Sequence, residues 1–155
     1  MRIISHMVLF AGFSLAVAGP LAGDAKKEAI EKDRQGFVGL WRVVSMEIDG
    51  KKMPDKDAKE FTIVNGLDGT WAVRMDTRDI MQGTSEIDPA QKTKTIDFTP
   101  TDGEDKGKVF LGIYEIKKDT RKLCFAPTGK DRPTEFSSDP GSGYILITCA
   151  REKTD

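Results

Sequence analysis

Carboxylates are the side chains left for acid–base chemistry in this chain, and among its 25 Asp and Glu residues the candidates are Asp97, Glu115 and Glu135. Glu115 lies two and four residues after Ile113 and Leu111, so the three side chains share one face of a strand. We expect Glu115 to end a row that faces the interior of a sheet. A carboxylate in such an interior has a raised pKa and could serve as an acid, a base or a ligand anchor. The competing interpretation, for Asp97 as well, is a charge at a strand end or on the outer face.

Histidine is nearly absent: the 155 residues contain one, His6, which lies in a predicted leader. A mature chain without histidine excludes Ser–His–Asp and Cys–His catalysis and histidine-based zinc or iron sites. Ser142 lacks the strand-to-helix Gly-x-Ser-x-Gly context of a nucleophile elbow. The segment 102–105 resembles a calcium loop only loosely, without its ligand spacing. We therefore predict a protein that is not an enzyme and carries no cofactor and no metal.

The two cysteines, Cys124 and Cys149, could form one disulfide in an oxidising compartment. Alternation argues against this bond. Leu123 and Phe125 are expected to face inward, so Cys124 should face outward, whereas Cys149 shares the inward parity of Ile147. Cysteines on adjacent strands can be bridged only from the same face. The sequence leaves both possibilities open.

The positions of these residues depend on a series of short strands. Runs rich in β-formers recur with turn residues between them, over residues 40–48, 60–64, 70–75, 80–87, 93–99, 109–116, 121–126 and 144–150. Asp49-Gly50 is a favoured hairpin dipeptide, and one helical turn is expected after Pro54. Upstream, residues 24–35 predict a short helix with Asp24 as its N-cap and Gly36 as its stop.

Eight short strands joined mostly by tight turns predict an all-β fold, an eight-stranded antiparallel meander barrel with a short N-terminal helix. Closing the meander removes its exposed edges, and a barrel of this size either holds one small ligand or is filled by its own side chains. An immunoglobulin-like sandwich is disfavoured because the Cys…Trp…Cys order is missing.

Several motifs also suggest a family. They are Gly39-Leu40-Trp41, Thr95–Pro100, Gly112–Glu115, Cys124–Pro127, Arg132–Phe136 and Pro140–Gly143. From about Gly36 to Arg151 the chain resembles a lipocalin-like domain family of uncharacterised proteins abundant in planctomycete bacteria. The resemblance implies structural roles for Gly39, Trp41 and Arg151: the indole plugs the closed end of a barrel, and the arginine of the last strand packs across it.

The first 18 residues predict a secretory signal peptide, with Arg2, an apolar run and an Ala16-Val17-Ala18 cleavage site. The run is short for a membrane span, so we expect no stable membrane insertion after cleavage and a periplasmic or secreted protein; an uncleaved anchor is the alternative. Cleavage leaves 155 − 18 = 137 residues: a linker and short helix over residues 19–35 and one lipocalin-like barrel domain over residues 36–155.

Charge limits the partners. The chain has 24 Lys and Arg against 25 Asp and Glu, a balance that gives no long-range attraction for nucleic acid or anionic lipid. Three functions remain open, and no protein partner is identified. The first is binding of a small hydrophobic or amphipathic ligand, by analogy with lipocalins. The second is a non-binding structural or protein-interaction module whose barrel is filled. The third, an enzyme that uses interior carboxylates, is the least favoured. A cavity of about 300 Å³ or more with a few convergent polar groups would favour binding, and a continuous packed core would favour the module.

A ligand is expected to enter opposite Trp41 and Arg151, with Tyr114 or Glu115 as polar contacts inside. The rim is predicted to include the turns at residues 49–50, 66–69 and 101–108. The long loop over residues 127–143 could lie at either end.

Overall fold

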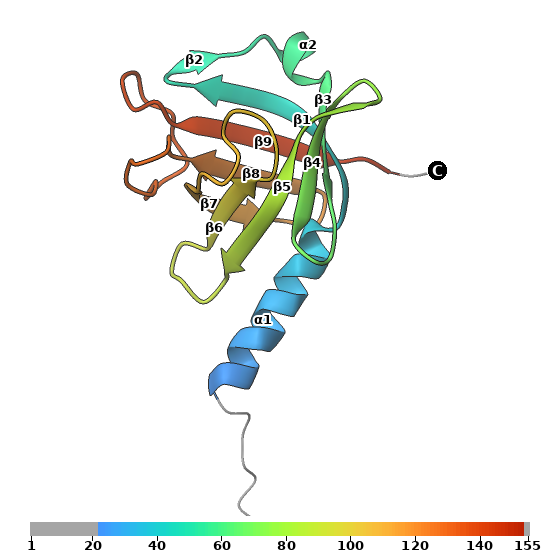
Figure 1. Cartoon of the computed structure of the whole chain (residues 1–155), viewed down its shortest axis with the longest axis vertical. Helices are drawn as coiled ribbons and strands as arrows, with labels where there is room; N and C mark the ends of the chain where they lie inside the picture. Colours follow the sequence, from blue (N-terminus) through green and yellow to red (C-terminus); the bar gives the residue numbers. More distant parts are fainter. Residues whose placement is uncertain (1–21, 154–155) are drawn as a thin grey trace, which may run out of the picture.

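The computed structural model describes residues 22–153, so the predicted leader over residues 1–18 lies outside the described residues. The described chain begins with helix α1 (Ala22–Phe37), and a short helix α2 (Asp55–Ala58) follows the second strand (Figure 1). The strands are β1 (Gly39–Ile48), β2 (Lys51–Lys52), β3 (Phe61–Asn65), β4 (Thr70–Met75), β5 (Arg78–Asp88), β6 (Thr95–Pro100), β7 (Phe110–Ile116), β8 (Thr120–Phe125) and β9 (Ile145–Arg151).

The sheet is an antiparallel meander that closes on itself. From β3 to β9 each strand pairs with the next, and β1 pairs with both β3 and β9. The closed barrel therefore has eight strands, β1 and β3–β9, and β2 is a two-residue addition to the edge of β1. The predicted fold class is confirmed. The helix differs from its predicted ends: it runs through Gly36 to Phe37, because burial of the Phe37 side chain extends it into the base of the barrel.

A β-bulge in β1 sets which of its side chains face inward. The register of β1 against β9 shifts between Val43 and Ser45, so one extra residue is inserted there. Before the bulge, Trp41 faces the core; after it, Met46 and Ile48 line the interior. Without the bulge, strict alternation would place the polar side chains of the second half of β1 inside the barrel.

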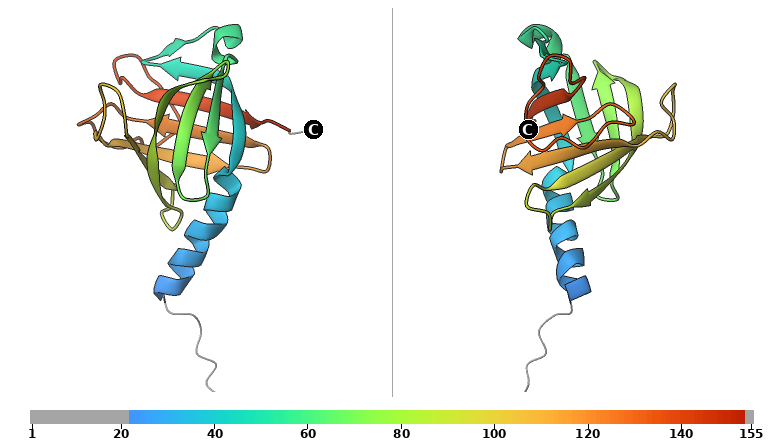
Figure 2. Two further views of the ribbon diagram at one scale, coloured as in Figure 1. Left: turned by 45° about the vertical axis from the view of Figure 1, so that its right-hand side comes forward. Right: turned by 90° about the vertical axis from the view of Figure 1, so that its left-hand side faces the viewer.

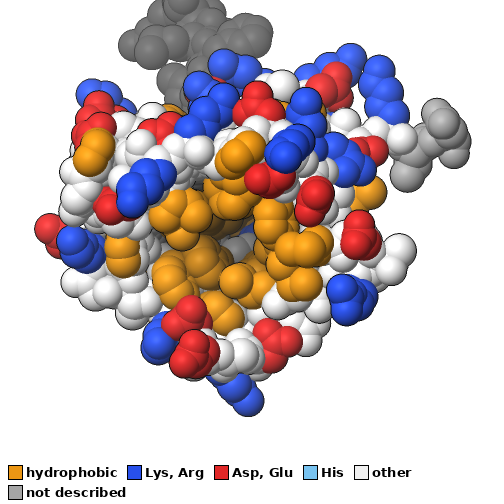
Figure 3. Space-filling view, turned by 90° about the horizontal axis from the view of Figure 1, so that it is seen from above, with side chains coloured by type: hydrophobic (Ala, Val, Ile, Leu, Met, Phe, Trp, Pro, Cys, Tyr) orange, Lys and Arg blue, Asp and Glu red, His pale blue; other side chains and the backbone are white. Residues whose placement is uncertain are grey.

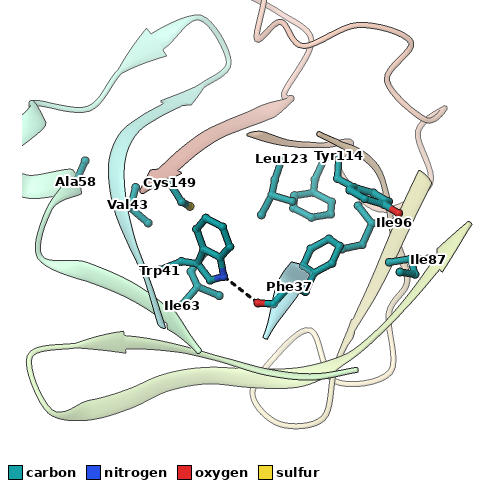
Figure 4. Close-up of a cluster of buried hydrophobic side chains, with 11 residues drawn as sticks. Phe37, Trp41, Val43, Ala58, Ile63, Ile87, Ile96, Tyr114, Leu123 and Cys149 are labelled. Carbon is teal, nitrogen blue, oxygen red and sulfur yellow. Dashed lines mark hydrogen bonds between the residues drawn. The ribbon is translucent and has the colours of Figure 1, made fainter. Parts of the chain in front are cut away.

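Helix α1 is fastened to one end of the barrel by its last turns (Figures 1 and 2). Trp41 Nε1 donates a hydrogen bond to the carbonyl oxygen of Phe37 at 2.8 Å. The Phe37 ring packs edge-on against Tyr114, with 5.0 Å between the ring centres, and the Tyr114 hydroxyl donates to Asp33 Oδ2 at 2.7 Å. Figure 4 shows Phe37, Trp41 and Tyr114 inside the barrel. We call this end of the barrel the closed end.

The seam between β1 and β9 starts at the closed end and runs towards the opposite end of the barrel. Trp41 and Arg151 are cross-strand partners, and the guanidinium carbon lies 4.2 Å from the centre of the indole ring. Arg151 also donates to the carbonyl oxygens of Val38 and Gly36, each at 2.7 Å. Gly39 has φ = 116°, and a Cβ there would lie 3.2 Å from Arg151 Nη1. The contact expected between Trp41 and Arg151 is present.

The two cysteines are free, so the possible disulfide is wrong. Cys149 pairs with Arg121 and belongs to the inner core, whereas Cys124 pairs with Leu146 and its thiol lies 3.3 Å from the carbonyl oxygen of Ser137 in the outer loop. The side chains thus lie on opposite faces of the sheet, where no disulfide can join them.

The long loop between β8 and β9 lies along the outside of the barrel and reaches the end opposite α1. Arg132 forms an ion pair with Asp97 on β6 and donates to the carbonyl oxygen of Gly112 on β7 at 2.7 Å. Ser138 Oγ accepts a hydrogen bond from the amide of Gly50, in the turn after β1. Sequence alone left the position of this loop undecided.

Candidate ligand-binding cavity

The barrel encloses a cavity of about 280 Å³. Viewed from the end opposite α1, the molecule shows a hollow lined by hydrophobic side chains and ringed by charged ones (Figure 3). We call this end the mouth. The apolar lining consists of Phe37, Met46, Ile48, Phe61, Ile63, Trp71, Val73, Ile80, Met81, Ile96, Phe98, Leu123, Phe125, Ile145 and Ile147. Three polar residues, Asn65, Ser85 and Arg121, complete it.

A second β-bulge shapes the mouth. Val73 pairs with Met81 and Arg74 pairs with Asp79, which leaves Ile80 as the extra residue of β5. Because of this bulge, Ile80 and Met81 both line the cavity although they are neighbours in sequence. They are 50% and 41% exposed, so the rim of the mouth is itself apolar. Such exposed apolar side chains around a hollow are typical of a ligand site.

Aromatic side chains stiffen one wall of the cavity. Phe98 packs edge-on against Trp71 and against Phe125, with ring centres 5.4 and 4.7 Å apart. Phe110 stacks parallel to Phe98 at 4.5 Å. Trp71 Nε1 donates to the carbonyl oxygen of Thr84 at 2.9 Å, so the indole satisfies its one polar atom within the wall. The wall facing a ligand here is therefore apolar and held in place.

The polar residues lie together at the inner end of the cavity. Asn65 ends β3, Arg121 lies near the start of β8, and Ser85 comes from the half of β5 that leads to the closed end. Ser85 Oγ is already engaged: it accepts from Arg34 Nη1 at 2.9 Å and donates to the carbonyl oxygen of Gly69 at 3.1 Å. The cavity thus runs from an apolar mouth to a polar floor.

Arg121 dominates this floor. Its side chain is 2% exposed, and the guanidinium lies 4.7 Å from the ring centre of Trp41 and 5.7 Å from that of Phe37. Nη1 donates to Asn65 Oδ1 at 2.7 Å, but Nε and Nη2 are buried without a hydrogen-bond partner. Burial lowers the pKa of Arg121; the neighbouring Cys149 opposes this effect, and Arg151 adds to it. A charged group in this state is unusual, because an unpaired buried charge is costly.

The thiol of Cys149 lies beside Arg121 but does not neutralise it. Burial raises the pKa of Cys149, and the opposing effect of the Arg121 charge is smaller. The thiol therefore stays protonated near neutral pH. It projects from β9 into the core beside Trp41 (Figure 4).

The residues proposed from sequence as polar contacts lie elsewhere. Tyr114 faces inward but lies behind Phe37, where its hydroxyl binds Asp33 rather than the cavity. Glu115 points outward and pairs with Lys117 at 3.1 Å, so the row of inward side chains expected to end at Glu115 is wrong. The register explains this: Phe98, which lines the cavity, pairs with Phe110, so the even-numbered residues of β7 face inward.

The carboxylates outside the cavity have structural partners or face solvent. Asp97 points outward to Arg132, and Glu135 is exposed in the long loop. Among residues 22–153 no group of three or more His, Cys, Asp or Glu side chains could hold a metal ion.

Arg121 was missed by sequence reasoning although a signal was present. Leu123 and Phe125 were expected to face inward, and Arg121 shares their parity on the same strand. A cation in an inward row is the kind of buried polar residue that calls for a partner.

The turn at residues 66–69 does not belong to the mouth, contrary to the sequence prediction. A Cβ on Gly69 would lie 3.0 Å from the guanidinium of Arg34 in α1, which places this turn at the closed end. Consecutive turns of a meander lie at opposite ends of a barrel, so the turns at residues 49–50 and 66–69 cannot share a rim.

Within the described residues, no helix has the length and apolar character needed to cross a membrane. Comparison with protein-family models, with curated proteins and with solved structures finds no match for this chain.

Proposed function

We propose that this barrel binds one small apolar or amphipathic molecule in its interior cavity. The observation that carries the proposal is the cavity itself: about 280 Å³ of space with an almost wholly apolar lining. A barrel filled by its own side chains would leave no such space, since protein interiors normally have few voids larger than a water molecule.

The shape of the cavity supports a ligand that enters through the mouth. Ile48, Ile80 and Met81 stand at the rim and are each at least 41% exposed, although they are large apolar residues. A ligand covering them would remove this surface from water, at about 25 cal/mol per Å².

The volume limits the size of the ligand. Pockets for drug-sized molecules usually measure about 300–1,000 Å³, and this cavity is slightly smaller than the lower limit of that range. The ligand is therefore narrow, or it leaves one end at the mouth. We also propose that binding takes place outside the cytoplasm, which rests on the leader predicted at residues 1–18.

Binding of the neutral dye Nile red, followed by its fluorescence, tests the proposal. The substitution Val73→Phe enlarges a side chain that lines the cavity and should abolish dye binding. Val64→Phe is the matched control, because its neighbour Ile63 lines the cavity and Val64 therefore points outward. This variant should bind the dye like the wild type, provided that both variants keep the far-ultraviolet circular dichroism of the wild type.

Two results would count against binding. The first is an absence of dye fluorescence with the wild-type protein, together with no thermal shift from hydrophobic compounds and no co-purifying small molecule in mass spectra. The second is an equal response from both variants. Either result would favour the structural or protein-interaction module.

A further inference from the structure

We propose that the ligand carries a carboxylate, which binds Arg121 on the floor of the cavity while its apolar chain extends towards the mouth. This inference rests on the proposed function and narrows it to one chemical class, the anions of apolar monocarboxylic acids.

The first argument is the incomplete hydrogen bonding of Arg121. A guanidinium has five N–H donors, and here only Nη1 has an oxygen partner, the Oδ1 atom of Asn65, while the Cys149 thiol beside it is a weak acceptor. Nε and Nη2 are buried without partners, although Arg121 lines a cavity with room for a molecule. A planar carboxylate matches the arginine fork and could accept from two of its N–H groups at once.

The second argument is the charge around Arg121. Among the described residues no carboxylate forms an ion pair with this side chain, and its nearest titratable neighbours are the neutral thiol of Cys149 and the cationic Arg151. Arg34 adds a further cation at the closed end, where it binds the backbone and hydroxyl of Ser85. The described residues thus supply no carboxylate to Arg121, whereas Asp68 and Glu86 offset the charge of Arg34.

The third argument is the position of the arginine relative to the apolar lining. Arg121 begins an inward row in which Leu123 and Phe125 follow towards the mouth, opposite Ile147 and Ile145. A molecule with its anionic group at Arg121 therefore places its apolar chain along this row. The reverse orientation would bury an apolar end against a guanidinium that lacks partners.

The test compares two ligands that differ only in the head group. Dodecanoate and dodecanol should each displace Nile red from the wild-type protein, with dodecanoate binding about tenfold more tightly, since hydrogen bonds to charged groups are worth about 1.5–3 kcal/mol. Arg121→Met keeps most of the side-chain volume and should remove this preference without weakening dodecanol. Arg151→Gln is the matched control: it removes a charge beside the same indole, outside the cavity, and should keep the preference.

A measurement on the wild-type protein covers the case in which Arg121→Met fails to fold. The carboxyl group of dodecanoate labelled with carbon-13 reports its own ionisation by NMR. A carboxylate bound to a guanidinium should stay ionised at pH values well below the ordinary pKa of the acid. Equal affinities for acid and alcohol in the wild type would overturn the inference. An equal loss of preference in both arginine variants, or an unchanged titration of the bound acid, would do so as well. Nile red binding stands apart from these results, so the proposed function can survive the loss of the head-group inference.

Discussion

Trp41 on β1 and Arg151 on β9 are direct partners across the seam that closes the barrel, with the guanidinium carbon 4.2 Å from the indole centre. Trp41 is fully buried, and its ring nitrogen donates a hydrogen bond to the carbonyl oxygen of Phe37, the last residue of α1. The pair therefore joins three parts of the chain at one point: the first strand, the last strand and the helix.

Replacing Trp41 with Ala should lower the free energy of unfolding by about 3–5 kcal/mol, as expected for deletion of a buried aromatic side chain. Urea denaturation followed by circular dichroism measures this. Arg151→Ala should cost less, about 1–2 kcal/mol, because it removes a partly exposed cation–π contact and three hydrogen bonds to backbone carbonyl oxygens. The double variant should lose less than the sum of the two, and full additivity would show that the contact carries no coupling energy.

Replacing Arg121 with Met should leave the free energy of unfolding of the ligand-free protein unchanged or raise it by about 1 kcal/mol. The reason is that a buried cation with two unpaired nitrogens opposes folding, whereas Met fills the same space without that cost. The same denaturation experiment checks it. A loss of several kcal/mol would mean that the stacking on Trp41 and Phe37 outweighs the buried charge.

The thiol of Cys124 should react slowly with Ellman's reagent in the native protein, because burial raises its pKa and the long loop covers it. Replacing Arg132 with Ala removes the ion pair with Asp97 that holds the loop to the barrel, and it should accelerate the reaction severalfold. A Cys124→Ser background isolates Cys149, whose reaction should stay slow with and without Arg132. An unchanged rate at Cys124 would show that other contacts hold the loop.

The hydroxyl of Tyr114 should make stability depend on pH in the alkaline range. Burial, together with its bond to Asp33, raises the pKa of Tyr114 far above the ordinary value near 10. The contribution of this hydroxyl to the free energy of unfolding is therefore complete below pH 10. It is lost as the pH rises further, because Tyr114 ionises there in the unfolded protein but not in the folded one. Thermal unfolding above pH 10 should show a steeper loss in the wild type than in Tyr114→Phe. Parallel curves would contradict this.

Export can be checked directly by sequencing the N-terminus of the protein recovered from the cell envelope or medium. The predicted leader, with its Ala16-Val17-Ala18 site, should give a mature chain that begins at Gly19. An intact Met1 in the membrane fraction would support the uncleaved anchor instead.

The strands could be predicted from sequence because alternation and turn residues mark them locally. The two-residue strand β2 is too short to carry such a pattern. The bulges in β1 and β5 were equally invisible, since each inserts a single residue that shifts the facing of those that follow. The rim residues Ile80 and Met81 depend on one of these shifts.

The direction in which the side chains of β7 point explains why the prediction for Glu115 is wrong. Ile113 points outward yet is 1% exposed, because its cross-strand partner Cys124 lies under the long loop. With both faces of this strand covered, apolar residues occur at odd and even positions alike, and alternation cannot decide which row faces inward. Glu115 was assigned to the interior for this reason. Arg121, on a strand whose parity was clear, could have been found.

The seal formed by Phe37, Trp41 and Arg151 also determines how molecules can be exchanged. A container with one opening has no through passage, so whatever occupies it must leave by the path along which it arrived. Two occupants cannot pass each other in about 280 Å³. A bound molecule must therefore leave before another can enter. Its dissociation rate does not change with the concentration of a competing ligand in solution.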